Sequence, residues 1–213
     1  MNVTNEIKNE IIILLNKEKL FGFDYIDNFD FSESRVLNNK LPNIIETLNE
    51  HISNCSLCEL SKMKSLSNFA GGNKESDIVI VSFSSEYDLS DKYFFDMKEV
   101  LNIDINDIYM TNILKCGSNK YKNNLDEEIR KCIVYLEQEI SIIKPKFIIT
   151  LGTAFNYIMN NHENVLDVSS NVYKYKGIKL FPLLDVDFIN KNPSYKNRMF
   201  TDLKKIKITM DKK

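Results

Sequence analysis

Apolar residues in this chain fall into two kinds of segment, which alternate from about residue 77 onward. Continuous apolar runs at 77–81 and 146–151 are typical of strands that are covered on both faces. The segment 126–143 instead repeats its apolar residues at helical spacing, and Lys144 and Pro145 end the pattern. Predicted strands therefore occupy 77–81, 107–114, 146–151 and 178–184. Predicted helices occupy 91–101, 125–143, with Asn124 as N-cap, and 197–208.

The order of these elements predicts the fold class. Strands that alternate with helices form a mostly parallel sheet with helices on both faces, so we expect an α/β protein. The predicted architecture is a three-layer α/β/α sandwich around a central, mostly parallel four-stranded sheet, with Ser90 as N-cap of the first helix after the first strand. The ligand crevice of such a sheet lies outside the carboxyl ends of its strands. That rule places it near 82–88, Asn112 and the loop after Leu184.

The first fifty residues do not share this alternation. Ile7, Ile11 and Leu14 recur at helical spacing, and 41–48 suggests a second helix with Pro42 in its first turn. We therefore predict a helical N-terminal extension over 1–50 and an α/β/α domain over 51–213. The extension is a candidate surface for a protein partner.

A chain of 213 residues is long enough to bury one substantial core. It does not open on a charged segment followed by an apolar one. Its apolar runs are also far shorter than the roughly 18 to 20 residues that span a bilayer. We predict a soluble, cytoplasmic, monomeric protein with no membrane partner.

The net charge of −2 hides an asymmetry between the two halves of the chain. Residues 1–110 carry 10 Lys and Arg against 19 Asp and Glu, whereas residues 111–213 carry 18 against 11. A basic half can meet the phosphate backbone of DNA, and we expect Lys115, Lys196 and Arg198 to contribute. The alternative is that these cations form an ordinary solvated surface.

The four cysteines of the chain form one close pair, Cys55 and Cys58, and two single residues, Cys116 and Cys132. In a reducing cytosol such cysteines are metal ligands or core residues more often than disulfides. Four thiolates can hold a 4Fe-4S cluster, whereas a zinc ribbon favours a second close pair. Cys132 also fits the apolar stripe of its helix. The spacing alone leaves a cluster, a zinc site and plain core thiols open.

Several motifs in order along the chain match one family. They are a Cys-x2-Cys segment at 55–58, a Tyr-x-Thr-Asn-x-x-Lys-Cys strand at 109–116, a Glu-Ile-x-x-Cys helix at 128–132, a Lys-Pro-Lys-x-Ile-Ile-x-Leu-Gly strand at 144–152 and a Pro-Ser-Tyr turn at 193–195. In these motifs the chain resembles the family 4 uracil-DNA glycosylases.

The resemblance implies a cofactor and a substrate. It implies that Cys55, Cys58, Cys116 and Cys132 hold a 4Fe-4S cluster. It also implies that Asn112 recognises uracil in a pocket that accepts an extruded nucleotide. A base edge with a carbonyl and an N–H requires a side chain that carries both a donor and an acceptor, which an amide provides.

The loop after the first strand departs from the family pattern. The family's Gly-Glu-x-Pro-Gly motif and its stacking aromatic are replaced by 82–88, which reads Ser-Phe-Ser-Ser-Glu-Tyr-Asp. Glu86 and Asp88 are the carboxylates of this loop that could assist glycosidic cleavage, although a plain surface pair is the alternative. Tyr87 or Phe83 could replace the stacking ring.

The last motif also departs from the family. Asn192 stands where the family has the histidine that stabilises the departing uracil anion, and an amide cannot carry the charge of an imidazole. Ser194 is retained in the same turn and is expected to contact the substrate.

Two functions follow from these observations. The first is a divergent uracil-DNA glycosylase of base-excision DNA repair that carries a 4Fe-4S cluster. It would excise uracil or a related base, weakly, from uracil-containing or single-stranded DNA. The second is a catalytically inactive DNA-binding or protein-interaction module that retains the glycosylase fold and cluster.

Overall fold

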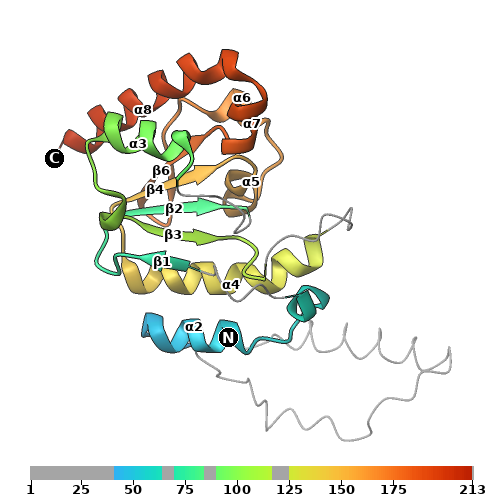
Figure 1. Ribbon diagram of the computed structural model, residues 1–213. Helices are drawn as coiled ribbons and strands as arrows, with labels where there is room; N and C mark the ends of the chain where they lie inside the picture. Colours follow the sequence, from blue (N-terminus) through green and yellow to red (C-terminus); the bar gives the residue numbers. More distant parts are fainter. Residues whose placement is uncertain (1–40, 64–69, 84–89, 117–124, 213) are drawn as a thin grey trace, which may run out of the picture. The chain divides into compact units, whose positions relative to one another are not determined.

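The computed structural model describes residues 41–63, 70–83, 90–116 and 125–212 (Figure 1). Residues 1–40, which include most of the predicted extension, lie outside this description. The compact unit described below begins at Leu41 and already includes helix α2, Ile45–Ser53. The predicted boundary near residue 50 stays a prediction.

The described residues form a six-stranded sheet in the order β1-β3-β2-β4-β6-β5 (Figure 1). The strands are β1 Ala70–Gly72, β2 Ile78–Ser82, β3 Tyr109–Asn112, β4 Phe147–Leu151, β5 Tyr173–Tyr175 and β6 Ile178–Leu183. The four central strands are parallel and are the four strands that the sequence predicts. Each edge strand is antiparallel to its neighbour and only three residues long. The sheet is therefore wider than predicted by two short edge strands.

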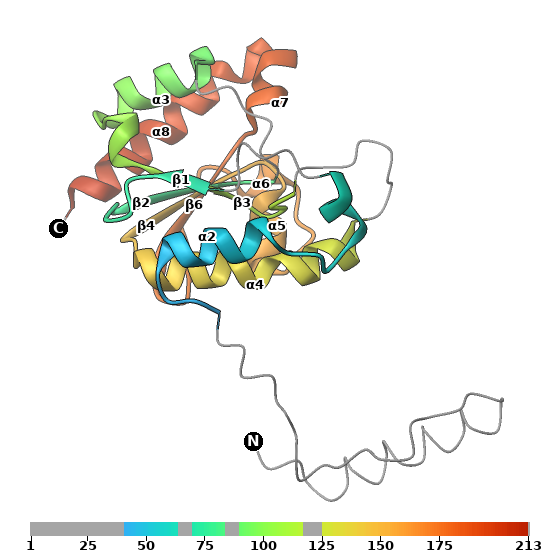
Figure 2. The same cartoon turned by 60° about the horizontal axis from the view of Figure 1, so that its bottom comes forward.

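Helices cover both faces of this sheet, which confirms the three-layer α/β/α architecture (Figure 2). They are α2, α3 Lys92–Leu101, α4 Asp126–Ile143, α5 Ala154–Met159, α6 Val165–Val168, α7 Val186–Lys191 and α8 Lys196–Asp211. Ile78 and Ile80 of β2 face a core that they share with α3, α7 and α8, which we call the α8-side core. Val79 and Val81 face the α4-side core, shared with α2, α4 and α5. Side chains alternate between the two faces of a strand, so one buried strand supplies both cores.

Local sequence signals set the ends of the helices. Asp91, rather than the predicted Ser90, is the N-cap of α3, because its carboxylate accepts the N–H of Tyr93 at 2.8 Å. Helix α4 ends where Lys144 adopts the left-handed conformation at φ 51° before Pro145. None of the described helices is both long and apolar enough to cross a membrane.

The parallel register brings the carboxyl ends of four strands to one edge of the sheet. Ser82 pairs with Asn112, and Leu151 pairs with Leu183. Strands β3 and β4 lie on opposite sides of β2, so the chain changes direction across the sheet at this point. Open α/β sheets bind ligands in the crevice that such a change of direction creates. We call this edge the carboxyl edge.

Candidate functional site

Asn112 is the last residue of β3 and is 7% exposed. The hydroxyl of Ser82, its register partner on β2, donates a hydrogen bond to Asn112 Oδ1. The backbones of β2 and β3 stay paired at their carboxyl ends, because the N–H of Ile113 donates to the carbonyl of Ser82 at 2.9 Å. The amide of Asn112 is therefore oriented at the carboxyl edge, as the sequence predicts.

Phe83 follows β2 at the same edge and is half-buried. Its ring lies 5.4 Å from the ring of Tyr157 on α5, and both side chains pack against the α4-side core. Tyr157, which the sequence analysis missed, has its pKa raised by burial and then by the charge of Asp126. The other predicted members of this loop, Glu86, Tyr87 and Asp88, lie outside the described residues.

Asp185 is a carboxylate of the carboxyl edge that the sequence analysis did not single out. It follows β6 and caps α7, accepting the N–H of Asp187 at 2.9 Å. Gly152, after β4, has φ +55°, and a Cβ at this position would come within 2.9 Å of Asp185 Oδ2. This close approach explains the glycine. A carboxylate directly after an apolar strand was the signal available in the sequence.

The predicted substrate turn lies after α7. Asn192 ends this helix, and its side-chain Nδ2 donates to the carbonyl of Phe188 at 2.9 Å. Ser194 is exposed in the single 3-10 turn Pro193–Tyr195. The amide of Asn192 therefore bonds back to its own helix.

The four cysteines gather at the α4-side core. Cys55 and Cys58 are half-buried in the loop after α2, whereas Cys116 and Cys132 are buried. Among the described residues, no three side chains of Cys, His, Asp or Glu are close enough together to hold a metal ion. The fold thus brings the four predicted ligands to one region, without the coordination sphere of a single ion.

Polar contacts around these thiols bear on what they could bind. Burial raises the pKa of Cys132, the backbone N–H of Lys115 donates to this sulfur and lowers the pKa, and the nearby Cys58 and Cys55 raise it. The side chain of Tyr135 is hydrogen-bonded to Cys55. Hydrogen bonds to sulfur and apolar surroundings suit thiolate ligands of an iron–sulfur cluster. In such a cluster each thiolate binds a different iron, so four sulfurs surround a volume instead of meeting at one ion.

Lys115 is not placed to bind DNA phosphates, in contrast to the prediction. It is 2% exposed, and its Nζ lies 2.6 Å from Glu139 Oε2 on α4 and 2.6 Å from Thr111 Oγ1. The Thr111 hydroxyl also donates to Glu139, at 2.5 Å. This buried network links the exit of β3 to α4. It fixes the segment between Asn112 and Cys116.

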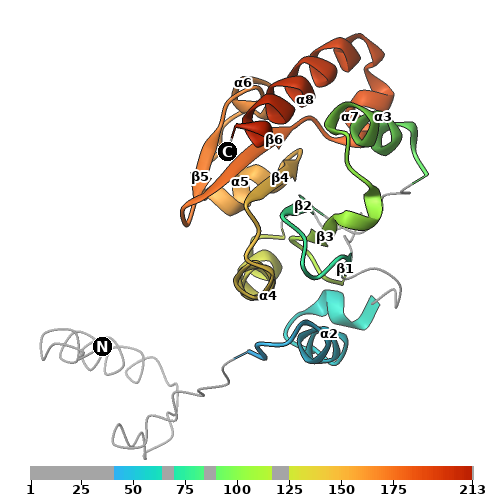
Figure 3. The ribbon, with the colours of Figure 1, turned by 90° about the vertical axis from the view of Figure 1, so that its left-hand side faces the viewer.

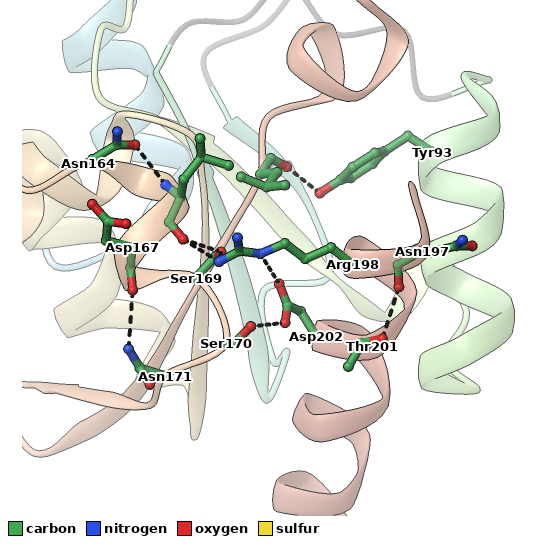
Figure 4. A network of polar contacts seen from close by, with 12 residues as sticks. Tyr93, Asn164, Asp167, Ser169, Ser170, Asn171, Asn197, Arg198, Thr201 and Asp202 are labelled. Atoms are coloured by element: carbon green, nitrogen blue, oxygen red, sulfur yellow. Dashed lines mark hydrogen bonds and ion pairs between the residues drawn. The ribbon is translucent and has the colours of Figure 1, made fainter. Parts of the chain in front are cut away.

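Lys196 and Arg198 also have internal partners, which the charge count could not reveal. Lys196 Nζ lies 2.7 Å from Asp96, whose side chain is only 9% exposed. Figure 4 shows Arg198 reaching from α8 toward the carbonyl of Leu166 and the hydroxyl of Ser169, to both of which it donates a hydrogen bond. Both cations therefore brace α8 against its neighbours, so removing them would disturb the fold.

Comparison with known proteins identifies the family. Residues 69–206 match the model of the uracil DNA glycosylase superfamily. The chain belongs to this superfamily. The type-4 uracil-DNA glycosylase of Sulfurisphaera tokodaii is 26% identical over 183 residues, covering 76% of this chain and 83% of the relative. That of Archaeoglobus fulgidus is 25% identical over 181 residues, covering 76% and 91%.

A third relative of this glycosylase-superfamily chain is much larger. The DNA polymerase of Bacillus phage SP01 is 27% identical over 144 residues, which cover 62% of this chain but only 16% of the polymerase. The superfamily match includes Asn112 and the turn at Pro193 and Ser194, but it begins after Cys55 and Cys58. Cys55 and Cys58 therefore do not contribute to the match with the superfamily model.

Proposed function

We propose that this chain is a divergent uracil-DNA glycosylase of base-excision DNA repair, which hydrolyses the N-glycosidic bond of uracil in DNA. The observation that carries the proposal is the oriented amide of Asn112 at the carboxyl edge. The superfamily match and the relatives named as type-4 uracil-DNA glycosylases support it. DNA is the proposed partner, and the protein would act as a monomer.

Base recognition would rest on the chemistry of the amide. Uracil presents a carbonyl acceptor next to an N–H donor, and an amide offers the complementary donor and acceptor. The Ser82 hydroxyl donates to Oδ1, which supports an orientation of the amide with Nδ2 facing the base. An extruded base could then be read by its Watson–Crick edge. Tyr87 would supply a stacking ring and Ser194 a polar contact, whereas the predicted alternative, Phe83, packs with Tyr157 against the α4-side core.

Bond cleavage would be the weaker part of the function. Glycosidic cleavage needs a carboxylate to orient water or to offset positive charge, and a donor to the leaving base. Glu86 and Asp88 are the proposed carboxylates. The donor side is impaired, because Asn192 replaces a histidine in the family motif and its Nδ2 already bonds to Phe188. Loss of one such donor costs about 2.7 to 4 kcal/mol, a hundredfold to thousandfold in rate.

We therefore expect slow or barely detectable uracil excision that depends on Glu86 or Asp88. Single-turnover assays on a uracil-containing single strand would compare the unaltered protein with Glu86→Gln, Asp88→Asn and Asn192→His. The carboxylate variants should lose residual activity, and the histidine variant should gain it. Fast excision that neither carboxylate substitution reduces would disprove the catalytic assignment.

The proposed cofactor is a 4Fe-4S cluster held by Cys55, Cys58, Cys116 and Cys132. Their common location, the hydrogen bonds to Cys132 and Cys55, and the all-thiol donor set fit such a group. When bound, the cluster would serve structure and the placement of DNA, without taking part in bond cleavage. The thiols face the α4-side core, whereas Ser82 and Asn112 lie on the other face of the sheet, in line with Ile80 and Met110.

Anaerobically purified protein should be brown, because thiolate-to-iron charge transfer absorbs broadly in the visible range. Iron and sulfide analysis should give about four of each per chain. Cys132→Ser should reduce the colour and the iron content, and a serine at another buried thiol, Cys116, should do the same. Colourless protein with stoichiometric zinc would contradict the cluster.

One observation favours the second candidate function, a catalytically inactive module that retains the fold and the cluster. One N–H of the Asn192 amide donates to the carbonyl of Phe188 in α7, which leaves the turn that should stabilise the leaving base with one fewer donor. Such a module would bind DNA or a protein without excision. The proposed N-terminal extension would then be the surface for a protein partner.

A further inference from the structure

The opposite edge of the sheet carries a group of lysines that the proposed site does not use. We call them the amino-edge lysines: Lys144, Lys146, Lys174, Lys176 and Lys179. Two precede β4, and the others lie on the hairpin of β5 and β6, where Phe147 of β4 pairs with Lys179 and Lys179 pairs with Lys174. Figure 3 looks onto this edge, with the β5–β6 hairpin beside β4 and the end of α4. Three neighbouring strands thus present lysines at one place.

Lys174 and Lys179 face each other directly across the antiparallel β5–β6 pair. Register partners project from the same face of a sheet, and like charges in this position are destabilising. Neither lysine forms an ion pair with any residue that the structure describes. Lys179 instead lies over the ring of Phe147, 5.8 Å from its centroid. The ring contact of Lys179 offsets the repulsion of the two lysines only in part.

The other amino-edge lysines are accessible to a ligand. Lys144, Lys146 and Lys176 are exposed. Lys146 pairs with Asp77 at 2.6 Å and Lys176 with Glu137 at 3.0 Å, and all four of these side chains are well exposed. Exposed ion pairs of this kind contribute little, so a phosphate could compete for the lysines.

Two acidic side chains lie among the amino-edge lysines: Asp77 pairs with Lys146 and Glu137 pairs with Lys176. Asp104 and Asp107 precede β3, which is separated from β4 by β2. Among the cations predicted to bind DNA near the carboxyl edge, Lys115, Lys196 and Arg198 all have internal partners. The starts of β4 and β6 and the end of β5 therefore carry cations of residues 111–213 that these three residues near the carboxyl edge do not supply.

We propose that the amino-edge lysines bind the phosphodiester backbone of DNA, as a contact surface separate from the crevice at the carboxyl edge. The proposal rests on DNA as the partner of the proposed function, but not on uracil recognition. A five-residue strand such as β4 places the two edges about 16 Å apart. The lysines would thus hold a second stretch of DNA while a base occupies the crevice.

The test is the double substitution Lys174→Gln/Lys179→Gln, measured on a uracil-free DNA duplex by fluorescence anisotropy between about 50 and 200 mM salt. Each lysine that neutralises a phosphate contributes about 0.9 to the slope of log affinity against log salt. We expect the variant to bind roughly tenfold or more weakly at 0.1 M salt, with a slope less steep by about 1 to 2. Its thermal stability should be unchanged or higher, because the like-charge pair is gone.

A matched control separates this surface from net charge. Lys62→Gln/Lys98→Gln also removes two positive charges, but from exposed side chains outside the β5–β6 hairpin. Lys62 pairs with Glu59, and Lys98 pairs with Asp104. This variant should retain most of the affinity and the salt slope. Equal losses in both variants, or no loss in Lys174→Gln/Lys179→Gln, would overturn the proposal while leaving the proposed function intact. Unaltered protein that binds no DNA at all would overturn both.

Discussion

Replacing Lys115 with methionine is expected to lower the free energy of unfolding by about 3 to 5 kcal/mol. The side chains of Lys115 and Glu139 are each only 1% exposed, and they meet at 2.6 Å. Without the Lys115 ammonium, the Glu139 carboxylate would stay buried and would lose its positive partner. Of this network, only the hydrogen bond from the Thr111 hydroxyl would remain. An uncompensated buried charge costs far more than the pair itself contributes. Urea-induced unfolding followed by circular dichroism measures the change.

Two further variants show whether the cause is the buried charge. Lys115→Met/Glu139→Leu removes both charges and should recover most of the stability, because apolar replacements for a buried ion pair are often neutral. Lys62→Met breaks an exposed pair, with side chains 71% and 74% exposed, and should change stability by less than about 1 kcal/mol. A Lys115→Met protein as stable as the unaltered one would rule out the role of this pair in fixing the exit of β3.

Replacing Asn112 with aspartate is expected to abolish the preference for uracil over cytosine. A carboxylate can only accept hydrogen bonds, so it repels the uracil carbonyl but accepts the amino group that cytosine carries at the same position. The substitution preserves size and the hydrogen bond from Ser82. A base contact with two hydrogen bonds discriminates by about 1 to 3 kcal/mol, so the affinity ratio should fall roughly tenfold to a hundredfold. Competition binding on strands that differ only in this base measures it.

The matched control for this change lies at the other end of the same strand. Asn106 is exposed in the turn that precedes β3, so Asn106→Asp adds the same charge away from the carboxyl edge. It should leave the uracil-to-cytosine ratio unchanged. If Asn106→Asp lowers the ratio as much as Asn112→Asp, the effect is one of net charge and not of base recognition.

The sequence predicts the centre of the fold better than its margins. Long apolar runs are possible only where both faces of a strand are covered, so the four parallel strands and the three layers can be predicted. Strands β1 and β5 have three residues each, and the Ala-Gly-Gly of β1 carries no apolar run. Their pairing depends on the neighbouring strand, which a local pattern does not contain.

The candidate site divides in the same way. Asn112 could be found because it matches an asparagine of the family's strand motif near the carboxyl end of a predicted strand, although that strand ends at Asn112 and not at Leu114. The roles of Lys115, Lys196 and Arg198 could not, because a sequence gives the sign of a charge but not its tertiary partner. Asp185 was missed because it looks like an ordinary helix cap, and its approach to Gly152 appears only in three dimensions.

The most direct test of a uracil pocket at Asn112 is the affinity ratio of the unaltered protein for two single strands that differ only in one uracil or cytosine. The proposed function predicts tighter binding to the uracil strand, and loss of that preference in Asn112→Asp. Equal affinity of the unaltered protein for both strands, or a preference for uracil that survives in Asn112→Asp, would contradict recognition of uracil by this residue.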